Sequence, residues 1–173
     1  MKNIVLLGFM GTGKTSIGRS LASKLQRRFV DLDNMIELDC GEKVSVIFAK
    51  HGESYFRTLE REMIVTVSHY KNTVIATGGG AVLYPENIDQ LRRNGVLITL
   101  TADPAVILER TARKTSRPLL NTPDPKQAIA TLLAERESLY QAADYIVDTS
   151  EGSVHEITDR IIALLKQGGH FCG

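Results

Sequence analysis

The sequence predicts an α/β fold in which helices cover both faces of a parallel β-sheet. Short apolar runs alternate with segments of helical period, which is typical of such folds. Several helix starts are marked by capping residues. A glycine-rich segment follows the first apolar run directly, as in folds that bind phosphate where a strand meets a helix. Together these observations favour a sheet sandwiched between two layers of helices.

The expected strands are the apolar runs, and the segments between them have helical period. The runs lie at residues 4–7, 29–30, 73–76, 96–100 and 145–147. Two helical faces stand out, one formed by Ile17, Leu21 and Leu25 and the other by Phe56, Leu59, Met63 and Val67. Both faces are expected to pack on the sheet or its core.

Three helix starts are expected from capping residues. Asp103 and Asp124 each precede a proline, which suits the first position of a helix. Ser153 and Glu156 have the spacing of a capping box. These signals concern stability rather than function.

Length and composition indicate one domain over residues 1–173. The chain can bury one core, and 21 Lys and Arg against 20 Asp and Glu leave a net charge of +1. This balance gives no broad attraction to nucleic acid or to an anionic membrane. No apolar stretch approaches the roughly 20 residues that span a bilayer, and the first run is too short for a signal peptide. Cys40 and Cys172 show no metal-ligand spacing, so a reducing, cytoplasmic setting is expected.

The segment GFMGTGKT, residues 8–15, has the spacing of a phosphate-binding loop. Its glycines let backbone N–H groups point inward, and the following helix adds its positive end. Lys14 can reach the β- and γ-phosphates, and the Thr15 hydroxyl can bind a Mg²⁺ that bridges them. The base-reading and switch motifs of GTPases are absent from the sequence. A small ATP-dependent kinase is therefore the favoured class.

Asp31 and Asp33 end the second apolar run, in the segment FVDLD. Two residues apart, they point the same way if the strand persists. One could position Mg²⁺ or its waters, and the other could accept a hydrogen bond from an attacking hydroxyl. Alternatively, Asp33 caps a helix that runs through Met35 and Ile36.

The segment TGGG, residues 77–80, follows the third apolar run. Three glycines leave backbone N–H groups uncovered for a ligand, or they form a flexible turn. Ligands of doubly wound sheets gather at the carboxyl ends of the strands. This loop, Asp33 and the phosphate-binding loop are therefore expected to share a pocket.

Three arginines suit an anionic acceptor, because a guanidinium binds a carboxylate through two parallel hydrogen bonds. Arg57 lies in YFRTLERE with Glu60 nearby, Arg136 lies in AERESLY and Arg117 lies in SRPLL. A helical arginine is usually a solvated surface charge. The interpretation therefore depends on the three together.

Residues 112–124, ARKTSRPLLNTPD, carry three basic residues and two prolines with little periodicity. A loop this long inside a compact domain is more often functional than an ordinary connection. It could close over the substrates as a lid that excludes water. The alternative is a solvated linker between helices.

With these motifs together, the chain resembles the shikimate kinase family, whose members phosphorylate the 3-hydroxyl of shikimate with ATP. The motifs GFMGTGKT, FVDLD, FAKHGESYFRTLE, ATGGG, SRPLL and ERESLY occur in family order over nearly the whole chain. The resemblance implies a three-layer αβα sandwich with a five-stranded parallel sheet, a P-loop kinase fold of the nucleoside-monophosphate-kinase type. A substrate-binding segment is expected at about residues 33–60 and a lid at about 112–124. The resemblance also implies a monomeric enzyme of aromatic amino acid and chorismate biosynthesis that uses Mg²⁺ and binds neither nucleic acid nor membranes.

The matching motifs carry the family's residue roles onto this chain. The implied catalytic residues are Lys14, Asp33 and Arg117. The implied ATP-binding residues are Gly11, Thr12, Gly13, Lys14, Thr15, Arg110, Arg117 and Ser153. The implied shikimate-binding residues are Asp33, Arg57, Gly78, Gly79, Gly80 and Arg136, with Glu60 orienting Arg57. Thr15 and Asp31 would bind Mg²⁺. The proline often found in the family's adenine loop is absent between Asp148 and Val154.

Two other functions stay open at this point. A small kinase of the gluconate type would also need Arg, Asp and Mg²⁺, and substrate selectivity separates it from the first interpretation. A nucleotide-dependent binding module without catalysis is disfavoured by the intact Lys14, Asp33 and Arg117. His170 and Cys172 could suggest a metal site, but a frayed terminus is the better interpretation.

Overall fold

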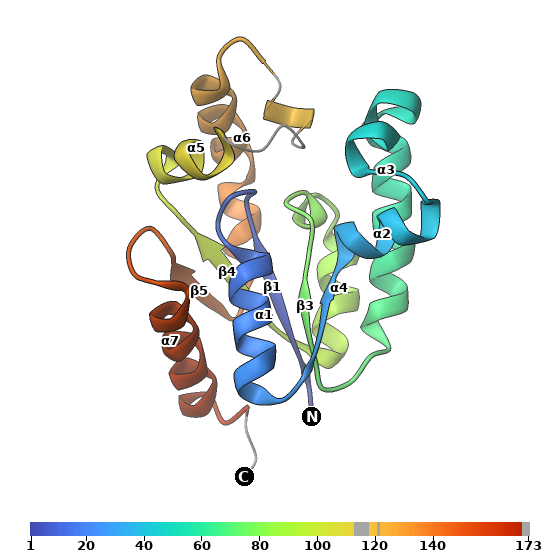
Figure 1. The fold of residues 1–173 in the computed structure, drawn as a ribbon. Helices are drawn as coiled ribbons and strands as arrows, with labels where there is room; N and C mark the ends of the chain where they lie inside the picture. Colours follow the sequence, from blue (N-terminus) through green and yellow to red (C-terminus); the bar gives the residue numbers. More distant parts are fainter. Residues whose placement is uncertain (113–117, 121, 171–173) are drawn as a thin grey trace.

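Five parallel strands form the centre of the molecule (Figure 1). The structure is a computed structural model that describes residues 1–112, 118–120 and 122–170. The strands are β1 (Asn3–Gly8), β2 (Arg28–Asp31), β3 (Thr73–Ala76), β4 (Gly95–Thr101) and β5 (Tyr145–Asp148), in the order β2-β3-β1-β4-β5. Each predicted apolar run lies within a strand, and the predicted sandwich with a five-stranded parallel sheet is confirmed.

The central strand, β1, is apolar on both of its faces. Val5 and Leu7 pack into the core on one side of the sheet, whereas Ile4 and Leu6 pack into the core on the other side. All four side chains are buried. Such continuous apolar runs are typical of parallel strands that helices cover on both sides.

Two helices, α1 (Lys14–Leu25) and α7 (Val154–Gln167), cover one face of the sheet (Figure 1). Their apolar stripes, which include Ile17 and Leu21 of α1 and Ile161 of α7, join one core cluster. The predicted face of the first helix is therefore confirmed.

The opposite face packs against a second core cluster, to which four other helices contribute. These are α3 (Val44–Ser68), α4 (Pro85–Asn94), α5 (Pro104–Ala112) and α6 (Pro125–Tyr140), with short 3-10 helices at Ala81–Leu83 and Pro118–Leu120. Ile64, Leu91, Ile107 and Ile129 each bring one of the four helices into this cluster. Because all the strand pairs are parallel, the carboxyl ends of the five strands lie at one edge of the sheet.

Helix α2 (Leu32–Cys40) and the first part of α3 form a small flank with its own apolar cluster of Ile36, Ile47 and Phe56. Within α3, Gly52 interrupts the helix with φ 80° and ψ 173°. Glycine adopts this conformation without the steric penalty that a side chain would bring.

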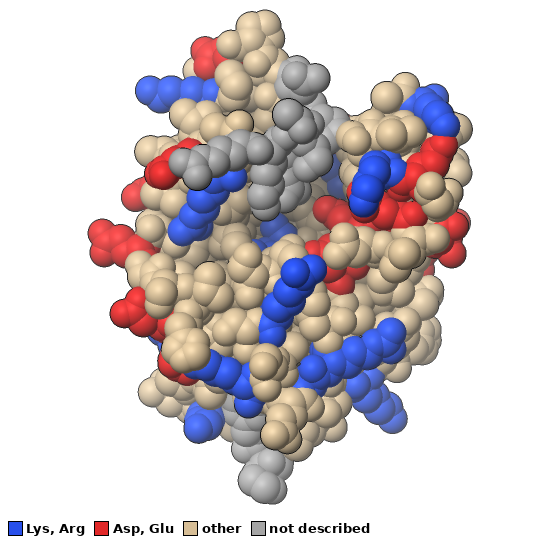
Figure 2. All heavy atoms as spheres, in the orientation of Figure 1, with Lys and Arg blue, Asp and Glu red and all other residues tan. Residues whose placement is uncertain are grey.

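Charged side chains tie α2 to the start of α3. The carboxylate of Glu37 accepts a hydrogen bond from the N–H of Val44 at 3.0 Å and pairs with Lys43 at 2.8 Å. Lys50 pairs with Glu42 on the same flank. Figure 2 shows basic side chains (blue) beside acidic ones (red) on the right of the molecule, where α2 and α3 lie in Figure 1. These contacts fix the wall of the pocket described below.

All three predicted helix starts are confirmed, and α5 begins at Pro104, directly after Asp103. The Asp124 carboxylate accepts a hydrogen bond from the N–H of Gln127 at 3.0 Å, and α6 begins at Pro125. Ser153 and Glu156 form the predicted capping box of α7. None of the helices in the described ranges is long and apolar enough to cross a membrane.

Candidate active site

The phosphate-binding loop, residues 8–15, joins β1 to α1 at the carboxyl edge of the sheet. Gly8, Gly11 and Gly13 have φ values of 136°, 81° and 95°, in the region that favours glycine. At Gly8 a side chain is also excluded by space, because a Cβ would lie 2.3 Å from the carbonyl oxygen of Leu100. The glycine spacing therefore reflects the backbone geometry that aims successive N–H groups at a phosphate.

Lys14 folds back over this loop. Its ammonium group donates hydrogen bonds to the carbonyl oxygens of Gly8 at 2.7 Å and Phe9 at 2.9 Å. The Thr12 hydroxyl donates to the same Phe9 oxygen at 2.8 Å. These contacts hold the ammonium group within reach of a phosphate in the loop.

A cavity of about 430 Å³ opens over the phosphate-binding loop. The predicted ATP-binding residues that line it are Gly11, Thr12, Gly13, Lys14, Thr15 and Arg110. Ser153 does not line it, because its hydroxyl donates to the Glu156 carboxylate at 2.8 Å in the capping box. The neighbouring Gly152 and Val154 line the cavity instead.

Thr149, directly after β5, lines this cavity, called the nucleotide cavity below after its predicted ligand, and links the phosphate-binding loop to β4 and to Arg110. Its side chain is buried, and its hydroxyl lies 2.9 Å from the carbonyl oxygens of Thr12 in the loop and Thr101 in β4. Arg110 donates hydrogen bonds to the carbonyl oxygens of Thr149 at 2.6 Å and Gly11 at 3.2 Å. Thr149 is not among the predicted ATP-binding residues. Its position directly after an apolar run is the signal that would have found it.

Asp31 and Asp33 do not continue a strand as predicted, because β2 ends at Asp31 and α2 begins at Leu32. Asp31 is the N-cap of α2, and its Oδ1 accepts a hydrogen bond from the N–H of Asn34 at 3.4 Å. The helix predicted through Met35 and Ile36 is present, but Asp33 lies in its first turn and is not the cap. The free N–H groups at a helix start are satisfied by an aspartate that precedes the first turn, which favours an early end of this edge strand.

Thr15 and Asp31 provide oxygen atoms of the kind that Mg²⁺ prefers. The Thr15 hydroxyl donates to Oδ2 of Asp31 at 2.7 Å, and both residues line the nucleotide cavity. One hydroxyl and one carboxylate beside a phosphate site fit Mg²⁺, which usually keeps several waters and uses few protein ligands. In the described part of the chain, no group of three or more His, Cys, Asp or Glu could hold a metal ion.

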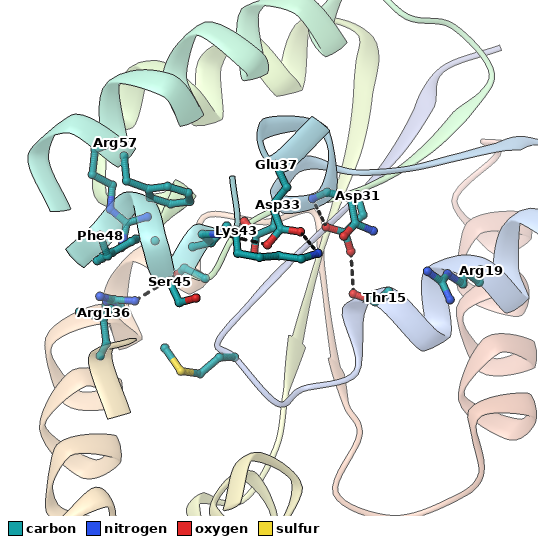
Figure 3. Close-up of a pocket in the computed structure, with 18 residues that line it drawn as sticks. Thr15, Arg19, Asp31, Asp33, Glu37, Lys43, Ser45, Phe48, Arg57 and Arg136 are labelled. Carbon is teal, nitrogen blue, oxygen red and sulfur yellow. Dashed lines mark hydrogen bonds and ion pairs between the residues drawn. The ribbon is translucent and has the colours of Figure 1, made fainter. Parts of the chain in front are cut away.

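A second cavity, of about 320 Å³, lies between α2, α3, α6 and the glycine loop after β3. The predicted substrate-binding residues all line it, namely Asp33, Arg57, Gly78, Gly79, Gly80 and Arg136. Arg57 and Arg136 reach one end of this cavity from different helices, and Thr15 and Asp31 lie at the other end (Figure 3). Part of the cavity wall is apolar and is formed by Met10, Phe48 and Leu119. These three residues were not predicted, because nothing in the sequence distinguishes them from core residues.

The two cavities meet. Thr15, Asp31, Asp33 and Gly79 line both of them. The predicted gathering of Asp33, the glycine loop and the phosphate-binding loop at one pocket is therefore what the structure contains. A nucleotide in one cavity and an acceptor in the other would touch at these residues.

Arg57 is only 4 % exposed, although a helical arginine is usually solvated. Its Nη1 donates to Glu60 at 2.8 Å, and its Nε and Nη2 donate to Glu53 at 3.2 and 2.9 Å. Burial acts to lower the pKa of Arg57, but the two carboxylates outweigh burial and hold its pKa above the ordinary value. The guanidinium therefore stays charged.

Glu60 is fully buried beside Arg57. Burial raises the pKa of the Glu60 carboxyl, and the pairing with Arg57 offsets only part of that rise. Its second oxygen, Oε1, has no hydrogen-bond partner among the described residues. The site thus holds a carboxylate that is costly to bury and whose charge is balanced chiefly by one arginine.

The glycine loop leaves room for these buried charges. A Cβ at Gly78 would lie 2.3 Å from Oε1 of Glu60, and a Cβ at Gly80 would lie 2.3 Å from Cζ of Arg57. Neither glycine has a φ in the left-handed region. Glycine is therefore required at both positions because side chains of α3 occupy the space that a Cβ would need. The sequence did not predict this reason.

Arg136 is a buried cation that forms no ion pair within the described ranges. Its Nη1 donates to the carbonyl oxygen of Gly79 at 3.3 Å, and its Nε has no hydrogen-bond partner among the described residues. Burying a charge without a partner is expensive. The charge of Arg136 acts on the nearby Glu60 carboxyl, and its guanidinium lies 5.9 Å from the centre of the Phe9 ring, so its charge is only partly compensated and it could bind an anion in this cavity.

Part of the predicted lid and of the tail lies outside the described residues. Within 112–124, residue Ala112 ends α5, residues 118–120 form a 3-10 helix and Asp124 caps α6. Residues 113–117 and 121, and with them the predicted catalytic Arg117, are outside the description. At the tail, His170 Nε2 lies 3.1 Å from the Tyr145 hydroxyl, whereas Cys172 is likewise outside.

Comparison with known proteins gives a consistent result. A family model described as shikimate kinase matches residues 10–166. A shikimate kinase of Caldanaerobacter subterraneus subsp. tengcongensis is 51 % identical over 170 residues, covering 98 % of this chain and 99 % of the relative. The solved shikimate kinase from Acinetobacter baumannii in complex with shikimate matches with a TM-score of 0.94 and 37 % identity, covering 97 % of this chain and 94 % of that one. A gluconokinase from Sinorhizobium meliloti matches with a TM-score of 0.62 at 18 % identity over 96 % of this chain and 92 % of that one, which is a likeness of fold alone.

Proposed function

The chain belongs to the shikimate kinase family, and we propose from this premise how the residues of its two cavities divide the reaction. The enzyme transfers the γ-phosphate of ATP to the 3-hydroxyl of shikimate, giving shikimate 3-phosphate and ADP, a step of aromatic amino acid and chorismate biosynthesis. One observation best supports the assignment of residues. The buried Arg57 and Arg136 lie at one end of a cavity whose other end meets the phosphate-binding loop.

In this proposal, Arg57 and Arg136 bind the carboxylate of shikimate. Arg136 has donors to spare, since its Nε has no hydrogen-bond partner among the described residues and its bond to the Gly79 carbonyl is a long one of 3.3 Å. Arg57 is held in place by Glu60 and Glu53, so its guanidinium is ordered before the substrate arrives. The backbone of Gly78, Gly79 and Gly80 forms the adjoining wall. The acceptor is thereby oriented with its hydroxyl groups toward the junction of the two cavities.

Asp33 is the proposed partner of the attacking hydroxyl. It lines both cavities and can accept a hydrogen bond, and then the proton, from the 3-hydroxyl as that oxygen attacks the γ-phosphorus. The bond from the γ-phosphorus to the bridging oxygen breaks as the new bond forms, and ADP leaves. Lys14 moves its charge from the loop carbonyls to the phosphates and stabilises the charge that develops on them.

We propose Thr15 and Asp31 as the protein ligands of Mg²⁺, directly or through water. Their oxygen atoms lie 2.7 Å apart beside Lys14 and fit the preferences of this ion. When bound with ATP, the ion would neutralise charge on the β- and γ-phosphates. Gly11, Thr12 and Gly13 offer the loop around those phosphates, and Arg110 borders the nucleotide cavity on the side of Thr149.

Three sequence predictions complete the proposal. Arg117 would add positive charge at the transferred phosphoryl group, and the segment 112–124 would close over the nucleotide as a lid. Ser153 would lie near the nucleotide through the backbone of its loop, because its side chain is engaged in the capping box.

We further propose that residues 1–173 act as one cytoplasmic, monomeric domain that binds neither nucleic acid nor membranes. The net charge of +1 supports small-molecule partners rather than polyanions.

The test is ADP release by the purified chain with Mg-ATP and either shikimate or gluconate. Shikimate should raise the rate strongly and gluconate should scarcely change it. Shikimate methyl ester, which lacks the charged carboxylate, should bind much more weakly than shikimate if both arginines grip that group. Equal stimulation by shikimate and gluconate would contradict the residue assignment at the acceptor cavity.

A further inference from the structure

Two donors from α6 converge on one carbonyl oxygen of the glycine loop. The hydroxyl of Tyr140 donates a hydrogen bond to the carbonyl oxygen of Gly79 at 2.7 Å. Arg136, one helical turn earlier, donates to the same oxygen at 3.3 Å. Both side chains are buried, with 6 % of Tyr140 and 3 % of Arg136 exposed. The carbonyl of Gly79 thus connects the proposed carboxylate-binding arginine with a tyrosine that the sequence analysis quoted but did not use.

The two hydrogen bonds are unequal. A distance of 2.7 Å is typical of a good O–H···O bond, whereas 3.3 Å lies beyond the common range for N–H···O bonds. The Tyr140 hydroxyl therefore satisfies the Gly79 oxygen by itself. Arg136 can leave that oxygen without stranding a buried acceptor, which would otherwise be costly.

We propose that Tyr140 is a positioning residue of the acceptor site, which holds the Gly79 carbonyl and so releases Arg136 to bind the carboxylate of shikimate. This inference rests on the proposed role of Arg136. It assigns to Tyr140 no contact with the substrate.

Other contacts suit Tyr140 to this task. Its own carbonyl oxygen accepts a hydrogen bond from the Thr99 hydroxyl at 2.8 Å, which fixes the end of α6 to β4. Burial raises the pKa of Tyr140 to about 12, and the nearby Arg136 offsets part of that rise. The hydroxyl therefore remains a donor throughout the neutral range. Gly79 lines both cavities, so its carbonyl must be held without disturbing either ligand.

The test is Tyr140→Phe, which removes the hydroxyl and keeps the ring that packs in the core. Without Tyr140 as donor, the Gly79 oxygen retains Arg136 as its remaining donor, and shikimate must compete for that guanidinium. The KM for shikimate should rise about five- to tenfold, while kcat and the KM for ATP change little. Tyr145→Phe is the matched control, because its hydroxyl contacts His170 and it lines neither cavity.

Arg136→Lys and the double variant separate this inference from the proposed function. If Arg136→Lys leaves the shikimate KM unchanged, the role of Arg136 is wrong and the inference falls with it. If Arg136→Lys raises that KM but Tyr140→Phe lowers only the thermal stability, or weakens both substrates equally, Tyr140 is merely structural. If Tyr140 acts through Arg136, the double variant should show less than the product of the two single effects. A full product would overturn the inference.

Discussion

Replacing Gly80 by alanine should weaken shikimate binding without straining the backbone. Gly80 has φ −100° and ψ 4°, and alanine is not excluded from this conformation. The added Cβ would lie 2.3 Å from Cζ and Nη2 of Arg57 and 2.4 Å from Nη1. Ordinary contacts begin at 3.4 Å, so the guanidinium must retreat by about 1 Å. The substitution therefore moves a binding group without altering it chemically.

The size of the effect follows from that displacement. A misplacement of about 1 Å can cost on the order of a hundredfold in a well-oriented site. A hydrogen bond to a charged group contributes about 1.5–3 kcal/mol, and about 1.4 kcal/mol corresponds to a factor of ten. Loss of one such bond from Arg57 to the carboxylate should raise the shikimate KM roughly ten- to a hundredfold. Gly80 does not line the nucleotide cavity, so the KM for ATP should change little.

Steady-state kinetics with each substrate varied would measure this effect, with thermal unfolding to confirm that the variant is folded. Arg57→Ala provides the matched background, because it removes the atoms that the new methyl group would meet. Gly80→Ala should therefore add little in that background. An unchanged shikimate KM in the single variant, or an equal effect with and without the Arg57 side chain, would refute the steric argument.

Three further predictions concern the charges of the site. Lys14→Met should remove most turnover while circular dichroism shows an intact fold, because the ammonium group acts on charge that develops at the γ-phosphate; near-normal turnover would exclude that role. Asp33→Asn should mainly lower kcat and Arg57→Lys should mainly raise the shikimate KM, with the exposed Arg61→Lys on the same helix as control; an Asp33→Asn effect on KM alone would make Asp33 a positioning group. Burial raises the pKa of Glu60, so the folded state binds a proton that the unfolded state has lost, and wild-type stability falls as pH rises above the ordinary value of 4.5. Glu60→Gln lacks this titration, so its Tm should rise relative to the wild-type Tm as the pH increases from 4.5 toward neutrality. A difference between the two Tm values that does not change with pH would count against the prediction.

The parts of this molecule that could be predicted from sequence are those set by local geometry. The phosphate-binding loop is an example, because Gly8, Gly11 and Gly13 are required by their own φ values and by the neighbouring strand. The cap at Asp124 and the capping box at Ser153 are equally local. Such features depend on a few consecutive residues, so a pattern in the sequence identifies them.

The end of β2 shows where local reasoning fails. Period-two spacing would put Asp31 and Asp33 on one face if the strand continued, but the chain turns into α2 at Leu32. A strand and a helix cap can use the same Asp-x-Asp segment, and the sequence does not say which hydrogen bonds form. Here Asp31 bonds both the helix start and the Thr15 hydroxyl, and the second bond comes from a residue of another element.

The burial of charged side chains is the property that the sequence predicted least well. Helical spacing put Arg57 and Glu60 on a face beside the apolar stripe, but their burial depends on the loop after β3. Gly78 and Gly80 have ordinary φ values, so their need for glycine arises from the carboxylate and the guanidinium that lie against them. It follows that residue 80 and residue 57 form one unit. A chain with a side chain at position 80 cannot keep an arginine at position 57 in this place, and the two positions should therefore change together.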